Sequence, residues 1–186
     1  MGTNTLERRL RRLEDRVEIG ELVMRYGLVM DDRDVDAMPA LFTPDVRIRS
    51  ADGVMDARGR DAAVAMFLGR FTVLGPSNHF THDRLVEFDA DDDDRATGLV
   101  LSHAEMQRKG QPMLAAMRYH DVYRRWEGRW CFAERLLSFM YYVPTADYLD
   151  AFGPGLDRRM RAYDQAVPAD WPEQLTTWKR YYPAKE

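Results

Sequence analysis

Two residues far apart in the sequence have the chemistry of a general base. Asp31 ends a stretch of helical periodicity, and His79 opens a stretch rich in β-branched and aromatic residues, just after Gly75-Pro76. A carboxylate beside an imidazole fixes the tautomer of the ring and stabilises the imidazolium that forms when the ring accepts a proton. If the fold brings Asp31 and His79 together, they can remove a proton from a substrate.

Arg135 is a third candidate for this site. It follows Ala133 and precedes Leu137 on a predicted strand, where a buried cation needs a partner. All three residues also have a structural interpretation: Asp31 could cap the following turn, His79 could be a hydrogen-bonded core histidine, and Arg135 could belong to a structural ion pair. The residues alone leave both interpretations open, because structural networks perturb charges too.

The elements that must position these residues begin with a long helix over residues 5–31. One apolar stripe follows three- and four-residue steps and includes Gly20; its members are Leu6, Leu10, Leu13, Val17, Met24 and Leu28. A second face carries Val23, Tyr26, Met30 and Asp31 at helical spacing. Tyr26 is therefore expected beside Asp31.

The rest of the chain changes from helices to strands. We expect a short helix over 35–42, a turn at Thr43-Pro44-Asp45, a strand over 46–50 and a helix over 59–71 that Gly75-Pro76 ends. Four strands follow with short connections, over 78–88, 97–108, 113–126 and 129–142. Sequential hairpins build an antiparallel meander, and helices followed by a meander predict an α+β fold with the helices on one sheet face.

Length and composition limit the function classes. The 186 residues predict one domain over 1–143 and a helical extension over 144–186, whose Trp171, Trp178, Tyr181 and Tyr182 should pack on the domain or on a partner subunit. A net charge of −4 argues against nucleic-acid binding. The charged N-terminus, the absence of a membrane-length apolar run and the single cysteine, Cys131, predict a cytoplasmic protein.

Three other motifs receive structural interpretations. Asp89–Asp93 resembles the start of a calcium loop, but Asp94 and Val100 stand where that loop needs Gly and Glu. His79 and His82 are three apart on a strand and face opposite sides, so we expect no metal and no cofactor. The arginines at 8, 9, 11 and 12 are interpreted as an ion-paired helix face, with Glu7–Arg11 and Arg11–Asp15 four residues apart.

Several segments resemble the SnoaL-like branch of the nuclear-transport-factor-2-like superfamily. They are Leu22–Asp36, Phe42–Asp45, Asn78–Phe80, Arg118–Tyr123 and Gly128–Phe132. The resemblance covers roughly residues 10–143 and implies a cone: a strongly curved antiparallel sheet that the N-terminal helices close over a deep pocket.

Within this superfamily the chain is most similar to scytalone dehydratase, bile-acid 7α-dehydratase and hexachlorocyclohexane dehydrochlorinase. The resemblance implies a cofactor-independent catalytic dyad in which Asp31 orients His79, with Arg135 assisting. Tyr26 lies where these enzymes place a residue that lines the pocket and in some of them is catalytic. Scytalone dehydratase has a second pocket histidine. Here the nearest candidate is His103, whose strand parity directs it away from the pocket.

The implied reaction starts with proton abstraction from carbon and continues as elimination, isomerisation or cyclisation. The expected pocket lining is mostly apolar and fits a hydrophobic, even polycyclic, small molecule; it comprises Ile48, Phe67, Val100, Ser102, Ala115, Met117 and Tyr119. The alternatives are a non-catalytic binding or dimeric module and a protein like the small subunit of a ring-hydroxylating dioxygenase. Arg118, His120, Val122 and Trp126 alternate on one strand and predict a homodimer through the outer sheet face.

Overall fold

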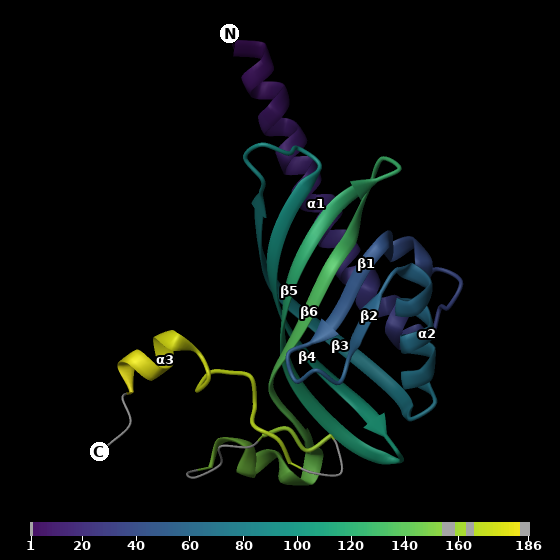
Figure 1. Cartoon of the computed structure of the whole chain (residues 1–186), viewed down its shortest axis with the longest axis vertical. Helices are drawn as coiled ribbons and strands as arrows, with labels where there is room; N and C mark the ends of the chain where they lie inside the picture. Colours follow the sequence, from purple (N-terminus) through teal and green to yellow (C-terminus); the bar gives the residue numbers. More distant parts are fainter. Residues whose placement is uncertain (1, 154–158, 163–165, 183–186) are drawn as a thin grey trace.

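The computed structural model describes residues 2–153, 159–162 and 166–182. Two helices precede the long strands, and the expected order of elements is confirmed (Figure 1). The elements are α1 Gly2–Asp32, the 3-10 helix η1 Met38–Leu41, β1 Phe42–Ser50, β2 Asp56–Arg58, α2 Arg60–Phe71, β3 Leu74–Phe88, β4 Arg95–Arg108, β5 Gln111–Trp126, β6 Arg129–Pro144, the 3-10 helix η2 Thr145–Phe152 and α3 Thr176–Tyr181.

The strands form one open sheet in the order β2-β1-β6-β5-β4-β3. The hairpins between β4, β5 and β6 turn at Lys109-Gly110 and Glu127-Gly128, where all four residues have positive φ angles as two-residue hairpin turns require. The expectation of a purely antiparallel sheet needs one correction, because β1 pairs with β6 in parallel. The sheet is therefore mixed, and the α+β class holds.

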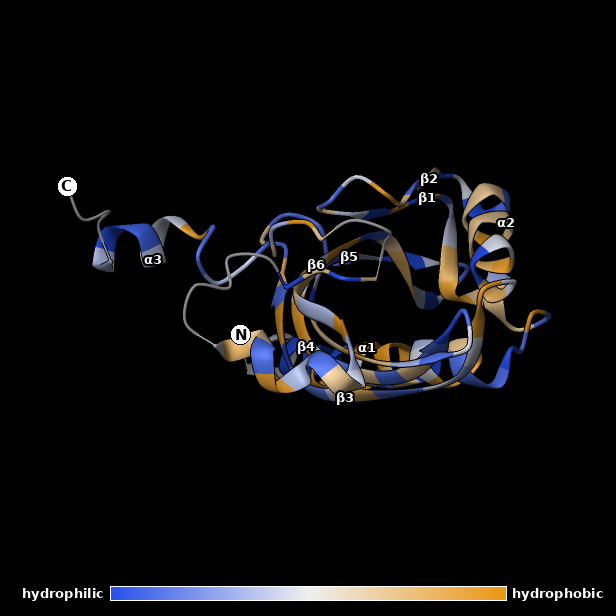
Figure 2. Ribbon diagram, turned by 90° about the horizontal axis from the view of Figure 1, so that it is seen from below, coloured by the Kyte–Doolittle hydropathy of each residue, from blue (hydrophilic) through white to orange (hydrophobic). Residues whose placement is uncertain are grey.

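The curvature of the sheet creates the space in which a site can form. Figure 2 shows β1 and β2 lying across from β3 and β4, with α2 beside β1. Tyr26 of α1 packs edge-on against Phe67 of α2 and Phe132 of β6, so one helix side chain joins the other helix to the sheet. The main core consists of such contacts between the two helices and the concave face.

The two apolar faces of α1 have different environments. The face with Val23, Tyr26 and Met30 is buried against the sheet. The stripe from Leu6 to Leu28 points away from the body, and its six apolar side chains are 55–66% exposed. Periodicity correctly predicts a helix here, but the longer of the two stripes is not part of the core.

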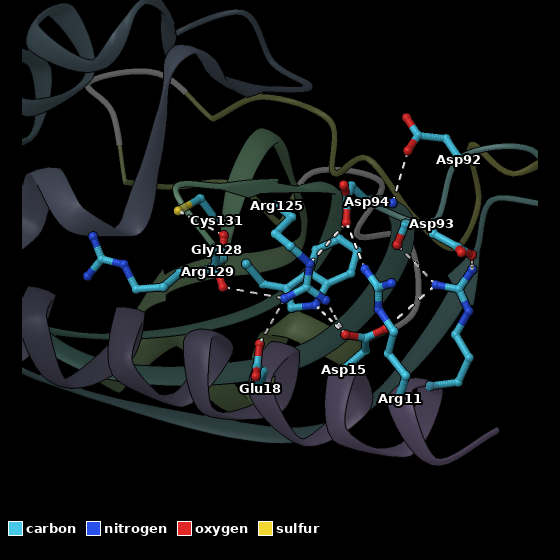
Figure 3. Close-up of polar contacts among 12 residues, drawn as sticks. Arg11, Asp15, Glu18, Asp92, Asp93, Asp94, Arg125, Gly128, Arg129 and Cys131 are labelled. Carbon is cyan, nitrogen blue, oxygen red and sulfur yellow. Dashed lines mark hydrogen bonds and ion pairs between the residues drawn. The ribbon is translucent and has the colours of Figure 1, made fainter. Parts of the chain in front are cut away.

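Polar contacts fix α1 to the end of the sheet (Figure 3). Arg125 of β5 pairs with buried Asp15, and the Trp130 indole donates to the same carboxylate oxygen at 3.0 Å. Arg11 pairs with Asp94, and Arg12 pairs with Asp93. The sequence had indicated ion pairs within the helix; one forms, between Arg12 and Asp15, but Arg11 and Arg12 also pair with the acidic turn between β3 and β4.

Three local expectations differ from the structure. Thr43-Pro44-Asp45 lies inside β1 rather than in a turn, and the pairing with β6 is irregular there, between Phe42 and Arg47. Helix α2 ends at Phe71, and Gly75-Pro76 belongs to β3, beside an irregularity in its pairing with β4. β2 was not predicted, because its three residues are too short to show a period.

The segment after β6 extends the sheet where β1 ends. Met160 bridges Tyr142 and Val167, and the backbone and carboxylate of Asp170 bond to the Phe139 backbone. The Arg118 guanidinium lies 4.0 Å from the Trp171 ring centre, so this segment covers part of the predicted dimer face. None of the helices within the described ranges is long and apolar enough to cross a membrane.

Candidate functional site

Asp31 and His79 are in direct contact. Nδ1 of His79 lies 2.7 Å from Oδ1 of Asp31, and the His79 backbone N–H donates to Oδ2 at 2.7 Å. The last turn of α1 supplies the carboxylate and β3 supplies the histidine. One carboxylate therefore fixes both the ring and the backbone of His79.

This geometry defines the tautomer of the ring. An ionised carboxylate only accepts hydrogen bonds, so Nδ1 carries the proton and Nε2 keeps its lone pair. Among the described residues, none forms a hydrogen bond with Nε2. His79 thus presents an unoccupied basic nitrogen, the arrangement that proton abstraction needs.

The carboxylate of Asp31 is held in its ionised form. Burial disfavours the charge, but the hydrogen bonds and charge of His79, together with Ser77, outweigh burial and lower the pKa of Asp31. Asp31 is therefore suited to orient and stabilise an imidazolium rather than to donate a proton.

Ser77 and Arg33 extend the network beyond the dyad. Ser77 donates its hydroxyl to Oδ1 of Asp31 at 2.7 Å and accepts from Nη1 of Arg33 at 3.1 Å. Arg33 also donates to the carbonyl of Gly75 at 2.6 Å. Neither Ser77 nor Arg33 was predicted from the sequence. Ser77 had a detectable signal, because it precedes His79 by two positions and so shares its strand face.

A small cavity of about 70 Å³ lies beside His79. Its lining is mostly apolar and contains four methionines; it comprises Tyr26, Met30, Arg33, Met55, Phe67, Arg70, Phe71, Leu74, Ser77, His79, Met106, Ala115, Met117, Tyr119, Leu137, Phe139 and Tyr142. An engineered cavity of about 150 Å³ is enough for benzene, so this one holds only a small group as it stands. Methionine side chains adapt readily, which allows such a cavity to widen.

The predicted pocket residues fall into two groups. Phe67, Ala115, Met117 and Tyr119 line the cavity, as does Tyr26. The other three are buried outside its lining; they are Ile48, Val100 and Ser102. Strand parity places a residue on the concave face, but it does not say whether a neighbouring side chain stands between that residue and the open space.

Tyr26 and Tyr119 present hydroxyl groups in an apolar environment. Their rings meet edge-on with centres 6.2 Å apart. Burial raises the pKa of both hydroxyls, so they remain protonated at neutral pH. The Tyr119 hydroxyl donates to Sδ of Met117 at 3.2 Å, a weak acceptor that a polar group of a ligand can replace, and Tyr26 can donate in the same way.

Arg135 lies behind this cavity. It is fully buried and forms two hydrogen bonds with Asp121, at 2.8 and 2.7 Å. Its guanidinium lies 4.0–4.3 Å from the ring centres of Phe132, Tyr26 and Tyr119. Arg135 does not line the cavity, and Asp121 balances its charge. The environment of Arg135 therefore fits a structural ion pair, one of the two interpretations that the sequence allows.

Two other arginines line the cavity. Arg70 comes from the last turn of α2, and Arg33 follows α1. Neither residue was predicted from the sequence, because an arginine at a helix end is ordinary on a protein surface. Both supply positive charge on the cavity side of the dyad.

His103 and His82 form a separate pair on the outer face of the sheet. Nε2 of His82 lies 2.6 Å from Nδ1 of His103. Burial and the charge of His82 lower the pKa of His103. The orientation expected from strand parity is confirmed. In the part of the chain that the structure describes, no group of three or more His, Cys, Asp or Glu side chains is placed to hold a metal ion.

A sequence model for the SnoaL-like domain matches residues 11–136. No curated protein sequence matches the chain significantly. The match includes Asp31, His79 and Arg135, and it ends before η2.

Solved structures share the fold. A protein provisionally named a scytalone dehydratase, from Novosphingobium aromaticivorans, has a TM-score of 0.65 and 20% identity over 72% of this chain and 89% of its own. A type-3 hexachlorocyclohexane dehydrochlorinase from Novosphingobium barchaimii has a TM-score of 0.66 and 19% identity, over 74% and 94%. A nuclear-transport-factor-2-like protein from N. aromaticivorans has a TM-score of 0.59 and 28% identity, over 74% and 89%.

Proposed function

The chain belongs to the SnoaL-like domain family, and we propose that it is a cofactor-independent enzyme that removes a proton from a carbon of a small hydrophobic molecule. The observation that carries the proposal is the Asp31–His79 contact, which leaves Nε2 of His79 free beside a cavity. The names of two structural relatives, a dehydratase and a dehydrochlorinase, support an elimination as the reaction class.

In such an elimination, Nε2 of His79 takes a proton from carbon while Asp31 stabilises the imidazolium. The electrons of the broken C–H bond form a double bond, and the leaving group departs from the neighbouring carbon with its bonding electrons. A halide leaves as the anion, whereas a hydroxyl leaves as water after accepting from the imidazolium the proton that His79 took from carbon. If the double bond shifts without loss of a group, the same first step gives an isomerisation.

Charge stabilisation in this proposal comes from groups that line the cavity. Tyr26 and Tyr119 supply neutral hydroxyl donors, and Arg70 supplies positive charge. Arg135 acts instead as a positioning residue, because it packs against the rings of both tyrosines and is already paired with Asp121.

Cavity size narrows the substrate class. A volume of about 70 Å³ is well below the roughly 300 Å³ of an ordinary pocket for a drug-sized ligand. We therefore favour a substrate with a single ring or a short chain. Even a single ring requires the methionines of the lining to move, and a polycyclic molecule requires a larger movement.

The experiment uses hydrogen exchange, because the reaction's first step breaks a C–H bond. The full chain in deuterium oxide is incubated with a panel of single-ring ketones and chlorinated cycloalkanes, and mass spectrometry records deuterium uptake and product formation. We expect exchange or elimination with at least one compound and a loss of at least about 100-fold in His79→Ala. His103→Ala, on the other sheet face, is the matched control and should keep the wild-type rate. A His79→Ala variant with full activity would falsify the base assignment.

The small cavity also favours a second candidate, a binding protein that does not turn over its ligand. Mass spectrometry of the intact protein under native conditions tests this candidate by revealing a retained molecule. A retained molecule that is chemically unchanged after prolonged incubation, with no deuterium uptake, identifies a binder.

A further inference from the structure

The described part of the chain leaves the apolar stripe of α1 exposed. Leu6, Leu10, Leu13 and Val17 point away from the sheet, and each is more than half exposed. Figure 1 shows the first turns of α1 projecting beyond the end of the sheet. An isolated apolar side chain on a surface is ordinary, but a continuous row along one helix marks an interaction surface.

The row has the spacing of a coiled coil. Its steps are four, three and four residues, which assign Leu10 and Val17 to heptad position a and Leu6 and Leu13 to position d. The next d position is Gly20, and a Cβ there would collide with the Arg84 guanidinium of β3. The apolar seam of α1 is therefore the segment Leu6–Val17.

The charges beside this seam identify the partner. Glu7, Glu14 and Glu21 occupy the e positions on one flank, and Arg9 and Arg16 occupy the g positions on the other. In a parallel pair of identical helices, each g residue faces the e residue five positions later on the other copy. Arg9 then meets Glu14, whereas Arg16 already donates to the Val86 carbonyl of its own chain at 2.8 Å. An antiparallel pair would instead place like charges together.

The helix is ready to make this contact. Ion pairs from Arg11, Arg12 and Asp15 attach α1 to the sheet end, so association does not need to order the helix. Among the described residues, neither Arg9 nor Glu14 has an ion-pair partner in its own chain. The row of glutamates also disfavours an anionic lipid surface as the occupant.

We propose that two copies of this chain associate through a parallel coiled coil formed by the α1 seam, Leu6–Val17. The contact has twofold symmetry, so one Arg9–Glu14 pair forms on each side of the seam. The proposal does not depend on the reaction proposed for the cavity, and it uses a different surface from the outer sheet face.

The first test measures the mass of the full chain in solution. Sedimentation velocity over a range of concentrations should show a species of twice 21.7 kDa. Leu10→Glu should raise the dissociation constant at least tenfold, while Leu85→Glu on the outer sheet face should not change it. Both positions are exposed, and circular dichroism verifies that each variant is folded. A wild-type monomer at all concentrations, or a dimer that only Leu85→Glu dissociates, overturns the proposal.

The second test determines orientation. In a parallel pair, Leu10 faces Leu10, so Leu10→Cys should form a disulfide between copies under mild oxidation. Arg8→Cys, outside the seam, is the control and should not cross-link; the native Cys131 is buried. Arg9→Glu should weaken association, and adding Glu14→Arg should restore it. If Leu10→Cys does not cross-link in a dimeric sample, or if the second charge change fails to restore association, the parallel arrangement is wrong.

Discussion

The carboxylate of Asp31 holds His79 at two points, through the ring nitrogen Nδ1 and through the backbone N–H. The backbone contact adds to those that Ser77 and Arg33 make between the end of α1 and β3. The double contact makes the position of Nε2 depend on the junction between α1 and β3. Changes at this junction should therefore affect both stability and any chemistry of the ring.

The first prediction concerns the charge of Asp31. Asp31→Asn removes a charged acceptor that receives three hydrogen bonds, so we expect the free energy of unfolding at neutral pH to fall by about 1–3 kcal/mol. The pKa of this carboxyl is lowered from 3.8 in the folded state. Its stabilising contribution is therefore complete above the unfolded-state value and is lost as pH falls through the folded-state value.

Urea unfolding at about pH 7 and about pH 3 measures the effect, and the difference between wild type and Asp31→Asn should shrink in acid. Asp32→Asn is the matched control at the next, exposed position and should change stability by less than about 0.5 kcal/mol. A difference between wild type and Asp31→Asn that is independent of pH would contradict the ionised state of Asp31.

The second prediction concerns the buried pair of Arg135 and Asp121. Arg135→Met leaves the carboxylate of Asp121 buried without its cation, and Asp121→Asn leaves the guanidinium without its anion. Either variant should lose about 3–5 kcal/mol. The double variant has no uncompensated charge. The amide that Asp121→Asn introduces keeps an oxygen that can accept from the Tyr123 hydroxyl, which in the wild type donates to Asp121 at 2.8 Å.

A double-mutant cycle measured by urea unfolding provides the test. We expect the double variant to be at least about 1 kcal/mol more stable than the sum of the single losses implies. Simple additivity would mean that Arg135 and Asp121 stabilise the fold independently, which the two hydrogen bonds between them argue against.

The sequence predicted the direction of a side chain where the period of a helix or strand determines it. Helical spacing placed Tyr26 on the buried face of α1, where it lines the cavity with His79, and strand parity directed His103 away from the cavity. Strand parity also places Asp121, the partner of Arg135, on the concave face with Tyr119 and Tyr123. The sequence did not indicate that the Asp121 carboxylate is buried.

Other features of the structure could not be predicted from local residue patterns. The parallel pairing of β1 with β6 joins residues about 90 positions apart, and no turn between adjacent elements encodes it. Two apolar faces on α1 were visible, but only the sheet determines which one is buried. Cavity volume depends on how Met30, Met55, Met106 and Met117 fill the space, and the sequence does not specify their rotamers.

The third prediction uses these methionines. Met55 is buried and lines the cavity, so Met55→Ala should enlarge it enough to admit a small aromatic molecule. We expect a loss of about 2–5 kcal/mol in stability, partly recovered in saturating indole or benzene. Thermal unfolding with and without the ligand measures this recovery. Val54→Ala is the adjacent control, at an exposed position, and should show no ligand effect. An equal ligand effect in both variants would place binding outside the cavity.

The fourth prediction concerns the contact that anchors α1. Arg125 and Arg124 are neighbours on β5, and each pairs with an aspartate, but Arg125 faces buried Asp15 whereas Arg124 faces exposed Asp45. Arg125→Ala should lose about 2–4 kcal/mol because the buried Asp15 carboxylate then keeps only the longer ion pair with Arg12, at 3.6 Å. Arg124→Ala should lose less than about 1 kcal/mol, since water screens an exposed pair. Urea unfolding at low and high salt separates the two: salt should abolish the Arg124→Ala effect and leave most of the Arg125→Ala effect. Equal losses in the two variants would mean that the anchor of α1 does not depend on Asp15.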